Sequence, residues 1–193
     1  DDPLRATTEV AVGYGLGLVL PLATLWLATS SIGDLIDDRL LVYLWLKPVS
    51  RWQLPAAAIL ATATVVVPLI AVPLVAAAVV GRASELVGTI LLASVLAVLA
   101  CSGIFVAAAL WLRRALWWGL FYILVWENGL ARAVDGAARL SISGYAQSLV
   151  ADAAGVKIAY ADRSVTASIA VPLVVALAGF ALATWRYGRA EVD

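Results

Sequence analysis

The chain has 193 residues, of which 64% are hydrophobic and 13% are charged, and its mean hydropathy is +0.99. A soluble domain carries about twice that charged share, and one of this size cannot hide so much apolar surface from water. The net charge is zero, there is no histidine, and Cys101 is the single cysteine. These features exclude disulfides and Cys/His metal sites, and they indicate no nucleic-acid partner. We therefore expect an all-α integral membrane protein.

The apolar stretches predict one transmembrane domain over 1–193. A spanning helix needs about 20 predominantly apolar residues, and four stretches meet that rule. A fifth span, less regular, begins with ALWWGLFYILVWENGL. The five predicted spans are 9–30, 54–80, 86–112, 115–130 and 164–185. An outer N-terminus without a signal peptide favours a further span before residue 1.

The basic residues predict the orientation, because short cytoplasmic loops carry an excess of lysine and arginine. One side of the predicted bundle receives seven of them: Arg39, Lys47, Arg51, Arg113, Arg114, Arg186 and Arg189. The other short loops contribute only Arg5 and Arg82. Residues 31–53 and the C-terminus are therefore expected on the cytoplasmic side of a bacterial inner membrane.

The polar stretch between the first two spans predicts a short amphipathic helix over about 34–47. Pro48 should end it, because the residue before a proline is disfavoured in the helical region. Its apolar face comprises Ile36, Leu40, Tyr43 and Leu44. Its start is acidic, with Asp34, Asp37 and Asp38. One interpretation is a helix resting among lipid headgroups with Trp45 and Trp52 as interfacial aromatics. The other is a docking surface for a cytoplasmic partner, since acidic residues suit an anionic leaflet poorly.

The segment between the last two spans predicts a helical hairpin over about 128–155, broken at Gly136. Ser141 is the expected N-cap of its second helix, and Leu140, Tyr145 and Leu149 are expected on one face. Helices this short do not cross the hydrocarbon core. The hairpin is therefore expected either at the outer interface or as a re-entrant element covered by protein.

Two motifs carry a resemblance to a known family. IDDRLLVYLWLKPVSRW (36–52) resembles the signature of ABC-2-type transporter permeases between their second and third spans. YILVWENGLARAVDGAARLSISGYAQSL (122–149) resembles the family's fifth span with its Trp-Glu pair, followed by a re-entrant hairpin. Arg39 and Leu40 stand where the family has a Gly-Thr pair. The resemblance covers nearly the whole chain and implies a type V exporter-like permease bundle.

The resemblance implies a transport subunit whose ATPase is a separate protein. The chain has no G-x-x-x-x-G-K-[ST] sequence, so it has no phosphate-binding loop of that kind. ATP and Mg²⁺ would be bound by two copies of an ABC ATP-binding subunit, with this chain itself not an enzyme. A second permease copy, or a homologous permease, would complete the path through the lipid bilayer. The residues expected to contact the ATPase are Asp37, Asp38, Arg39, Tyr43, Leu44, Lys47 and Arg51.

A second group of residues is expected at the transport path or gate: Trp118, Tyr122, Trp126, Glu127 and Tyr145. Trp118, Tyr122 and Trp126 recur at helical spacings of four, where packing or a dimer seam is the alternative role. Placing the Glu127 carboxylate within a bilayer costs free energy, so this side chain should face protein or water. It is interpreted either as part of the substrate exit or as a side chain that holds the hairpin through N–H groups.

Two rival functions remain open from the sequence. An intramembrane enzyme would pair Glu127 with Asp135 or Asp152, because acid chemistry without a metal needs two carboxylates held close together. A scaffold subunit of a larger membrane complex would transport nothing. It would be expected to have lost the coupling helix, the predicted helix at about 34–47 that would contact the ATPase. Stimulation of the partner ATPase would separate a scaffold from a permease.

Overall fold

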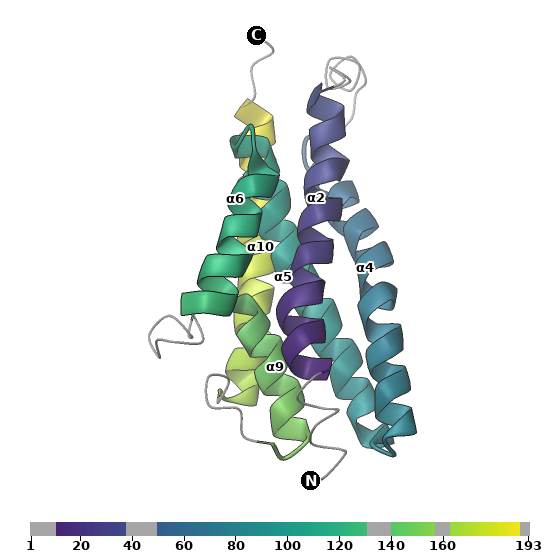
Figure 1. Ribbon diagram of the computed structural model, residues 1–193. Coiled ribbons are helices and arrows are strands. Elements are labelled where there is room, and N and C mark those ends of the chain that lie inside the picture. The colour runs from purple at the N-terminus through teal and green to yellow at the C-terminus, as the bar shows by residue number, and fades with distance from the viewer. Residues whose placement is uncertain (1–10, 38–49, 131–139, 157–162, 190–193) are drawn as a thin grey trace.

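The computed structural model describes residues 11–37, 50–130, 140–156 and 163–189. Within these ranges the chain forms helices and turns with no strand, so the all-α prediction is confirmed. The long helices that contain residues 20–37, 87–111 and 165–189 run in one direction, and the long helix that contains residues 53–80 runs in the opposite direction (Figure 1). The elements are η1 (Ala11–Val19), α2 (Leu20–Asp37), α4 (Gln53–Val80), η2 (Ser84–Leu86), α5 (Val87–Trp111), α6 (Ala115–Phe121), η3 (Tyr122–Leu130), α9 (Ile142–Ala153) and α10 (Val165–Arg189).

Four helical segments among the described residues are long and apolar enough to cross a membrane. They are Val12–Gly33, Gln53–Val80, Ser84–Trp111 and Val165–Arg189. These segments match four of the five predicted spans, which confirms the transmembrane character of the chain. The fifth predicted span, 115–130, is helical but is divided into α6 and the π-helical η3. It is not among the four because α6 and η3 together comprise only 16 residues, fewer than the roughly 20 that a spanning helix needs.

The first predicted span continues beyond its expected end at residue 30. Helix α2 runs without a break to Asp37, so the first residues of the expected helix 34–47 belong to α2. The serines at the expected break do not interrupt it, because their hydroxyls bond to carbonyls of the same helix. Ser30 Oγ donates to the Leu27 carbonyl at 3.3 Å and Ser31 Oγ to the Ala28 carbonyl at 2.9 Å. The remaining part of the expected coupling helix lies outside the described residues.

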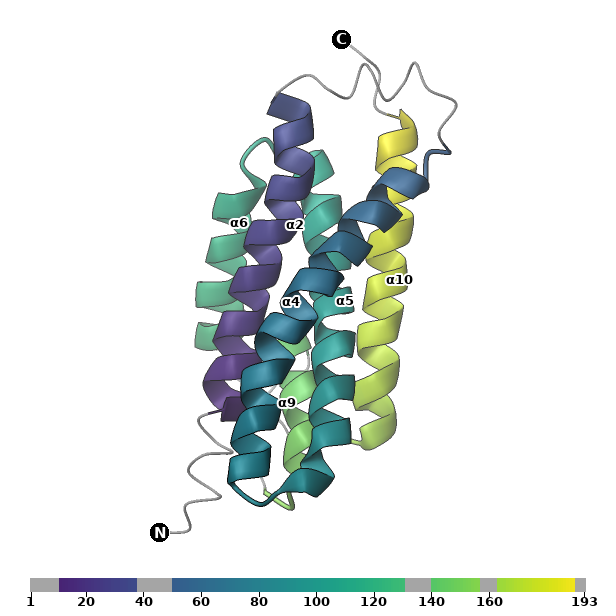
Figure 2. The ribbon, with the colours of Figure 1, turned by 90° about the vertical axis from the view of Figure 1, so that its right-hand side faces the viewer.

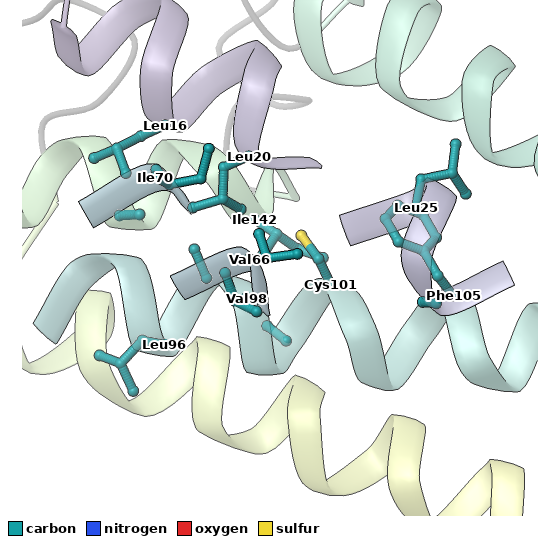
Figure 3. Packing of buried hydrophobic residues seen from close by; sticks show 14 of the residues in the cluster. Leu16, Leu20, Leu25, Val66, Ile70, Leu96, Val98, Cys101, Phe105 and Ile142 are labelled. Carbon is teal, nitrogen blue, oxygen red and sulfur yellow. The ribbon is translucent and has the colours of Figure 1, made fainter. Parts of the chain in front are cut away.

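Helix α5 forms the centre of the bundle, where it packs against α2, α4, α9 and α10. Val98, Cys101 and Phe105 on α5 are buried in one apolar cluster with Leu25 of α2 and Val66 of α4 (Figure 3). The outer faces carry large apolar side chains instead of polar ones. These include Leu60, Leu69 and Val72 of α4, and Val174, Leu177 and Leu182 of α10. An apolar exterior around a packed interior is the arrangement that lipid favours.

Two glycines allow α5 and α10 to approach closely. A Cβ atom added to Gly179 would lie 2.5 Å from the carbonyl carbon of Gly103, and one added to Gly103 would lie 3.0 Å from the Ala176 carbonyl oxygen. Small residues at helix crossings permit such contacts in membrane proteins, where close packing replaces the hydrophobic effect as a source of helix association. The two glycines therefore fix the closest approach of these helices.

The π-helix η1 is followed by Pro21, the second residue of α2. Pro21 has no N–H group, so it cannot donate to the carbonyl of Gly17, its partner in an α-helix. That carbonyl accepts a hydrogen bond from Nδ2 of Asn128 at 3.3 Å instead. Asn128 Nδ2 also donates to the carbonyl of Ile123 at 3.0 Å, within η3. One amide therefore joins two π-helical segments, η1 and η3.

The second helix of the predicted hairpin is α9, and it lies inside the bundle. Ser141 is its N-cap as predicted, accepting a 3.1 Å bond from the Gly144 N–H. Every residue from Ile142 to Ala151 is buried, which fits the alternative in which protein covers this element. Leu140 is 65% exposed and precedes the helix, which corrects its placement on a face with Tyr145 and Leu149. The reason is that η1, α5 and α10 surround α9 on several sides.

Candidate functional site

Glu127 lies where η3 meets the beginning of α9, deep within the bundle. Its side chain is 3% exposed. Oε1 accepts two hydrogen bonds, from the Ser143 backbone N–H at 2.7 Å and from Ser141 Oγ at 3.2 Å. The first residues of a helix have N–H groups without partners inside the helix. Glu127 therefore supplies, from another helix, part of the cap of α9.

The charge of Glu127 suits this position. The N-terminal end of a helix carries a partial positive charge, so a carboxylate placed there is stabilised. The other oxygen, Oε2, is buried without a hydrogen-bond partner among the described residues. The carboxylate thus holds α9 through one oxygen, and its second oxygen is directed elsewhere in the interior. The interpretation that Glu127 binds N–H groups of the hairpin agrees with this geometry.

Arg163 also contacts the first turns of α9. Its guanidinium lies 4.2 Å above the centroid of the Tyr145 ring. Its backbone N–H donates to Ser148 Oγ at 3.1 Å, and that hydroxyl lies 3.3 Å from the Arg163 carbonyl oxygen, to which it donates. Burial lowers the pKa of the Arg163 guanidinium from its usual value, while the neighbouring Tyr145 and Glu127 act in the opposite direction. An arginine nevertheless stays charged, so a cation and a carboxylate flank the first turns of α9.

Gly144 makes room for this cation. A Cβ atom at Gly144 would lie 2.5 Å from Arg163 Nη1, so any larger residue would move the guanidinium. Gln147, on the next turn, donates from Nε2 to the carbonyl of Val12 at 3.3 Å and is 2% exposed. Polar side chains of α9 thus reach η1, η3 and Arg163, two residues before α10. We call this group the α9 polar cluster: Glu127, Ser141, Ser143, Tyr145, Gln147, Ser148 and Arg163.

The structure brings together two of the five residues expected at the path or gate. Glu127 and Tyr145 belong to the α9 polar cluster. Trp118 is 60% exposed and makes an edge-to-face contact with Phe121, with ring centroids 6.4 Å apart. Tyr122 and Trp126 are half-buried. Trp118 belongs to α6, and Tyr122 and Trp126 belong to the π-helix η3 that continues it.

Of the residues expected to contact an ATPase, the structure describes the side chain of Arg51. Its Nη1 donates a 2.7 Å hydrogen bond to the carbonyl of Gly188, near the end of α10. The backbone of Asp37 ends α2. Asp38, Arg39, Tyr43, Leu44 and Lys47 lie outside the described residues.

The arrangement does not form the carboxylate pair that an intramembrane enzyme would need with Asp152. Glu127 binds the N-terminal end of α9, whereas Asp152 is exposed at its other end. Nine helical residues separate Ser143 from Asp152, which corresponds to about 14 Å. Asp135 lies outside the described residues.

No local pattern in the sequence pointed to Arg163, Asn128 or the Arg51 contact. Arg163, Asn128 and Arg51 bond to partners that are 15, 111 and 137 residues away in the chain, respectively. A charged residue directly before a span, or an amide within one, would have been the available hint, since such groups in a membrane protein need partners. No protein-family model, curated protein or solved structure matches this chain.

Proposed function

We propose that this chain is the membrane permease subunit of an ATP-driven exporter of the ABC-2 type. The observation that carries the proposal is α9, a twelve-residue helix that follows the segment 115–130, is buried against η1, α5 and α10, and is capped by Glu127. A helix of that length covers about 18 Å and does not cross the hydrocarbon core. A buried re-entrant helix after a Trp-Glu pair is what the resemblance to ABC-2-type permeases implies.

In this proposal residues 1–193 cross the bacterial inner membrane five times. The segment 115–130 and α9 each reach only part of the way through the bilayer, and together they make one of the five crossings. The end of the bundle that carries Arg51, Arg113, Arg114, Arg186 and Arg189 faces the cytoplasm, because basic residues accumulate there. The C-terminus is then cytoplasmic, and the residues 38–49 lie within reach of a soluble partner.

The proposed partners are two ATP-binding subunits and a second permease copy. Neighbouring helices α2 and α6 expose large aromatic side chains: Trp26 is 70%, Trp117 70%, Trp118 60% and Phe121 59% exposed. Large exposed apolar patches mark interaction sites with protein or lipid. We propose this face, together with Tyr122 and Trp126, as the side on which the second permease copy would pack. ATP and Mg²⁺ would be bound by the ATP-binding subunits alone.

The test is reconstitution of the chain with the ATP-binding subunit that co-purifies with it in mild detergent. A permease is expected to raise the ATPase rate of that subunit in proteoliposomes. Substitution of Tyr43 and Leu44 by aspartate should abolish the increase, and Leu177→Ala, on the exposed apolar face of α10, should not. Co-purification of no ATP-binding subunit would contradict the proposal.

A scaffold subunit is the alternative that the buried α9 does not by itself distinguish. It would bind its partners through the same surfaces without changing ATP hydrolysis. An unchanged ATPase rate in a complex that forms stoichiometrically would favour the scaffold.

A further inference from the structure

Arg51 stands between the segment expected to touch the ATPase and the first turn of α4. It precedes Gln53, the first residue of α4, by two positions, and the turn is closed by Gln53 Oε1, which accepts from the Ser50 N–H at 3.1 Å. The Arg51 side chain extends to α10 and donates from Nη1 to the Gly188 carbonyl at 2.7 Å. The last carbonyls of a helix lack donors inside the helix, and a charged donor makes a stronger hydrogen bond than a neutral one.

The contact links the start of α4 to the end of α10. Figure 2 shows the first turns of α4 beside α10, with α4 then crossing α5 and moving away from α10. Gly188 leaves space for the arginine, since a Cβ there would lie 3.5 Å from both Cδ and Nη1 of Arg51. A methyl group would fit at that distance, and a longer side chain would not.

A second set of contacts joins the same end of α10 to α5. The Arg189 guanidinium lies 4.3 Å from the centroid of the Trp185 ring, and the Trp185 and Trp111 rings are 6.3 Å apart at 37°. Farther along, Gly103 and Gly179 hold α5 and α10 in close contact. The end of α10 is therefore attached to α5 through aromatic rings and to α4 through Arg51.

We infer that Arg51 is a positioning residue that makes α4, α5 and α10 move as one unit when a partner displaces the segment before α4. The displacement by a partner rests on the proposed function, whereas the link between α4 and α10 through Arg51 is a property of this chain alone. Arg51 acts on the Gly188 carbonyl, and it transmits a displacement without itself touching the ATPase. The sequence placed Arg51 among the residues expected to contact the ATPase, and this inference gives it a different role from the others, at 37–47.

The inference is tested by measuring the distance between α4 and α10 in the full chain in lipid nanodiscs. Spin labels at Ala57→Cys and Ala181→Cys, both exposed positions, report it in a Cys101→Ala background. The unsubstituted Arg51 should give one narrow distance distribution. Arg51→Gln should broaden it, Gly188→Leu should broaden it by displacing an intact arginine, and Arg51→Lys should restore part of the narrow component.

The matched control is Arg186→Gln, which removes a cation from the same end of α10 without a bond to another described residue. It should leave the α4–α10 distribution unchanged. Equal distributions for Arg51→Gln and the unsubstituted chain would overturn the inference. So would equal broadening by Arg186→Gln, because the effect would then come from charge alone.

A second measurement separates this inference from the proposed function. With a co-purifying ATP-binding subunit, Arg51→Gln should retain binding of that subunit and lose the stimulation of its ATPase rate. Loss of binding would overturn the positioning role and make Arg51 a docking residue. The nanodisc distances need no partner, so they decide the role of Arg51 even if the proposed transport function fails.

Discussion

The carboxylate of Glu127 accepts a 2.7 Å hydrogen bond from the backbone N–H of Ser143, 16 residues later in the chain. The bond joins the end of one helical segment to the beginning of a buried helix. Because α9 has polar side chains on several sides and does not cross the bilayer, its position depends on contacts of this kind.

Glu127→Ala should destabilise the protein more than Glu127→Gln does. Alanine leaves the Ser143 N–H and the Ser141 hydroxyl without their acceptor, at a cost of about 1–3 kcal/mol for each buried group. Glutamine keeps an acceptor oxygen at nearly the same place. The free energy of unfolding in mixed detergent micelles is the measurement, with Glu85→Ala, an exposed carboxylate, as the control. Equal losses for alanine and glutamine would show that Glu127 does not cap α9.

Gly144→Ala should displace the Arg163 guanidinium from the Tyr145 ring. A cation–π contact is worth about 0.5–2 kcal/mol, whereas alanine in place of glycine within a helix favours folding by up to about 1 kcal/mol. The two effects oppose each other, so the decisive quantity is their coupling in a double-mutant cycle with Arg163→Ala. We expect the effect of Gly144→Ala on the free energy of unfolding to be more stabilising by about 0.5 kcal/mol or more in the Arg163→Ala background than in the unsubstituted chain.

The control for this cycle is Gly33→Ala, a helical glycine with open space where its Cβ would lie. Its effect should be the same with and without Arg163. A coupling near zero at Gly144 would mean that Arg163 moves aside without loss.

Asn128→Leu should lower the stability of the protein, because the Gly17 carbonyl would lose its donor in the interior. Hydrogen bonds between side chain and helix in membranes contribute about 0.6 kcal/mol on average and up to about 1.7 kcal/mol. Pro21→Ala restores a backbone N–H that can donate to Gly17, so the cost of Asn128→Leu should decrease in that background. The measurement is the free energy of unfolding in mixed micelles for the two single variants and the double variant. An undiminished cost would indicate that Asn128 acts through its bond to Ile123 instead.

Gly179→Ala should destabilise the contact between α5 and α10 by about 1–3 kcal/mol, the usual cost of overpacking. The added methyl group would meet the backbone of Gly103, which has no side chain that can rotate away. Gly88→Ala, also in a helix but with nothing within 4 Å of its added Cβ, should be neutral or stabilising. Thermal unfolding in detergent compares the two, and similar melting temperatures would contradict a close crossing.

The sequence by itself determined the lipid-facing helices. Their lengths and apolar composition are local properties, because a segment in lipid must satisfy its backbone hydrogen bonds internally and present apolar side chains outward. That is why four of the predicted spans match helices long and apolar enough to cross a membrane. The Ser141 cap was also predicted, because an N-cap depends on the residues next to it. The end of the first span was misplaced, because α2 continues past residue 30 to Asp37 through serines whose hydroxyls bond within the helix.

The tertiary structure alone decided where α9 lies and what holds it. Tyr145 and Leu149 have the spacing of an amphipathic surface helix, but burial on all sides depends on η1, α5 and α10, which come from distant parts of the chain. The same holds for the partners of Glu127, Asn128 and Arg51. A hydrogen bond across many residues leaves no periodic trace in the sequence, since only the packing of the helices brings its donor to its acceptor.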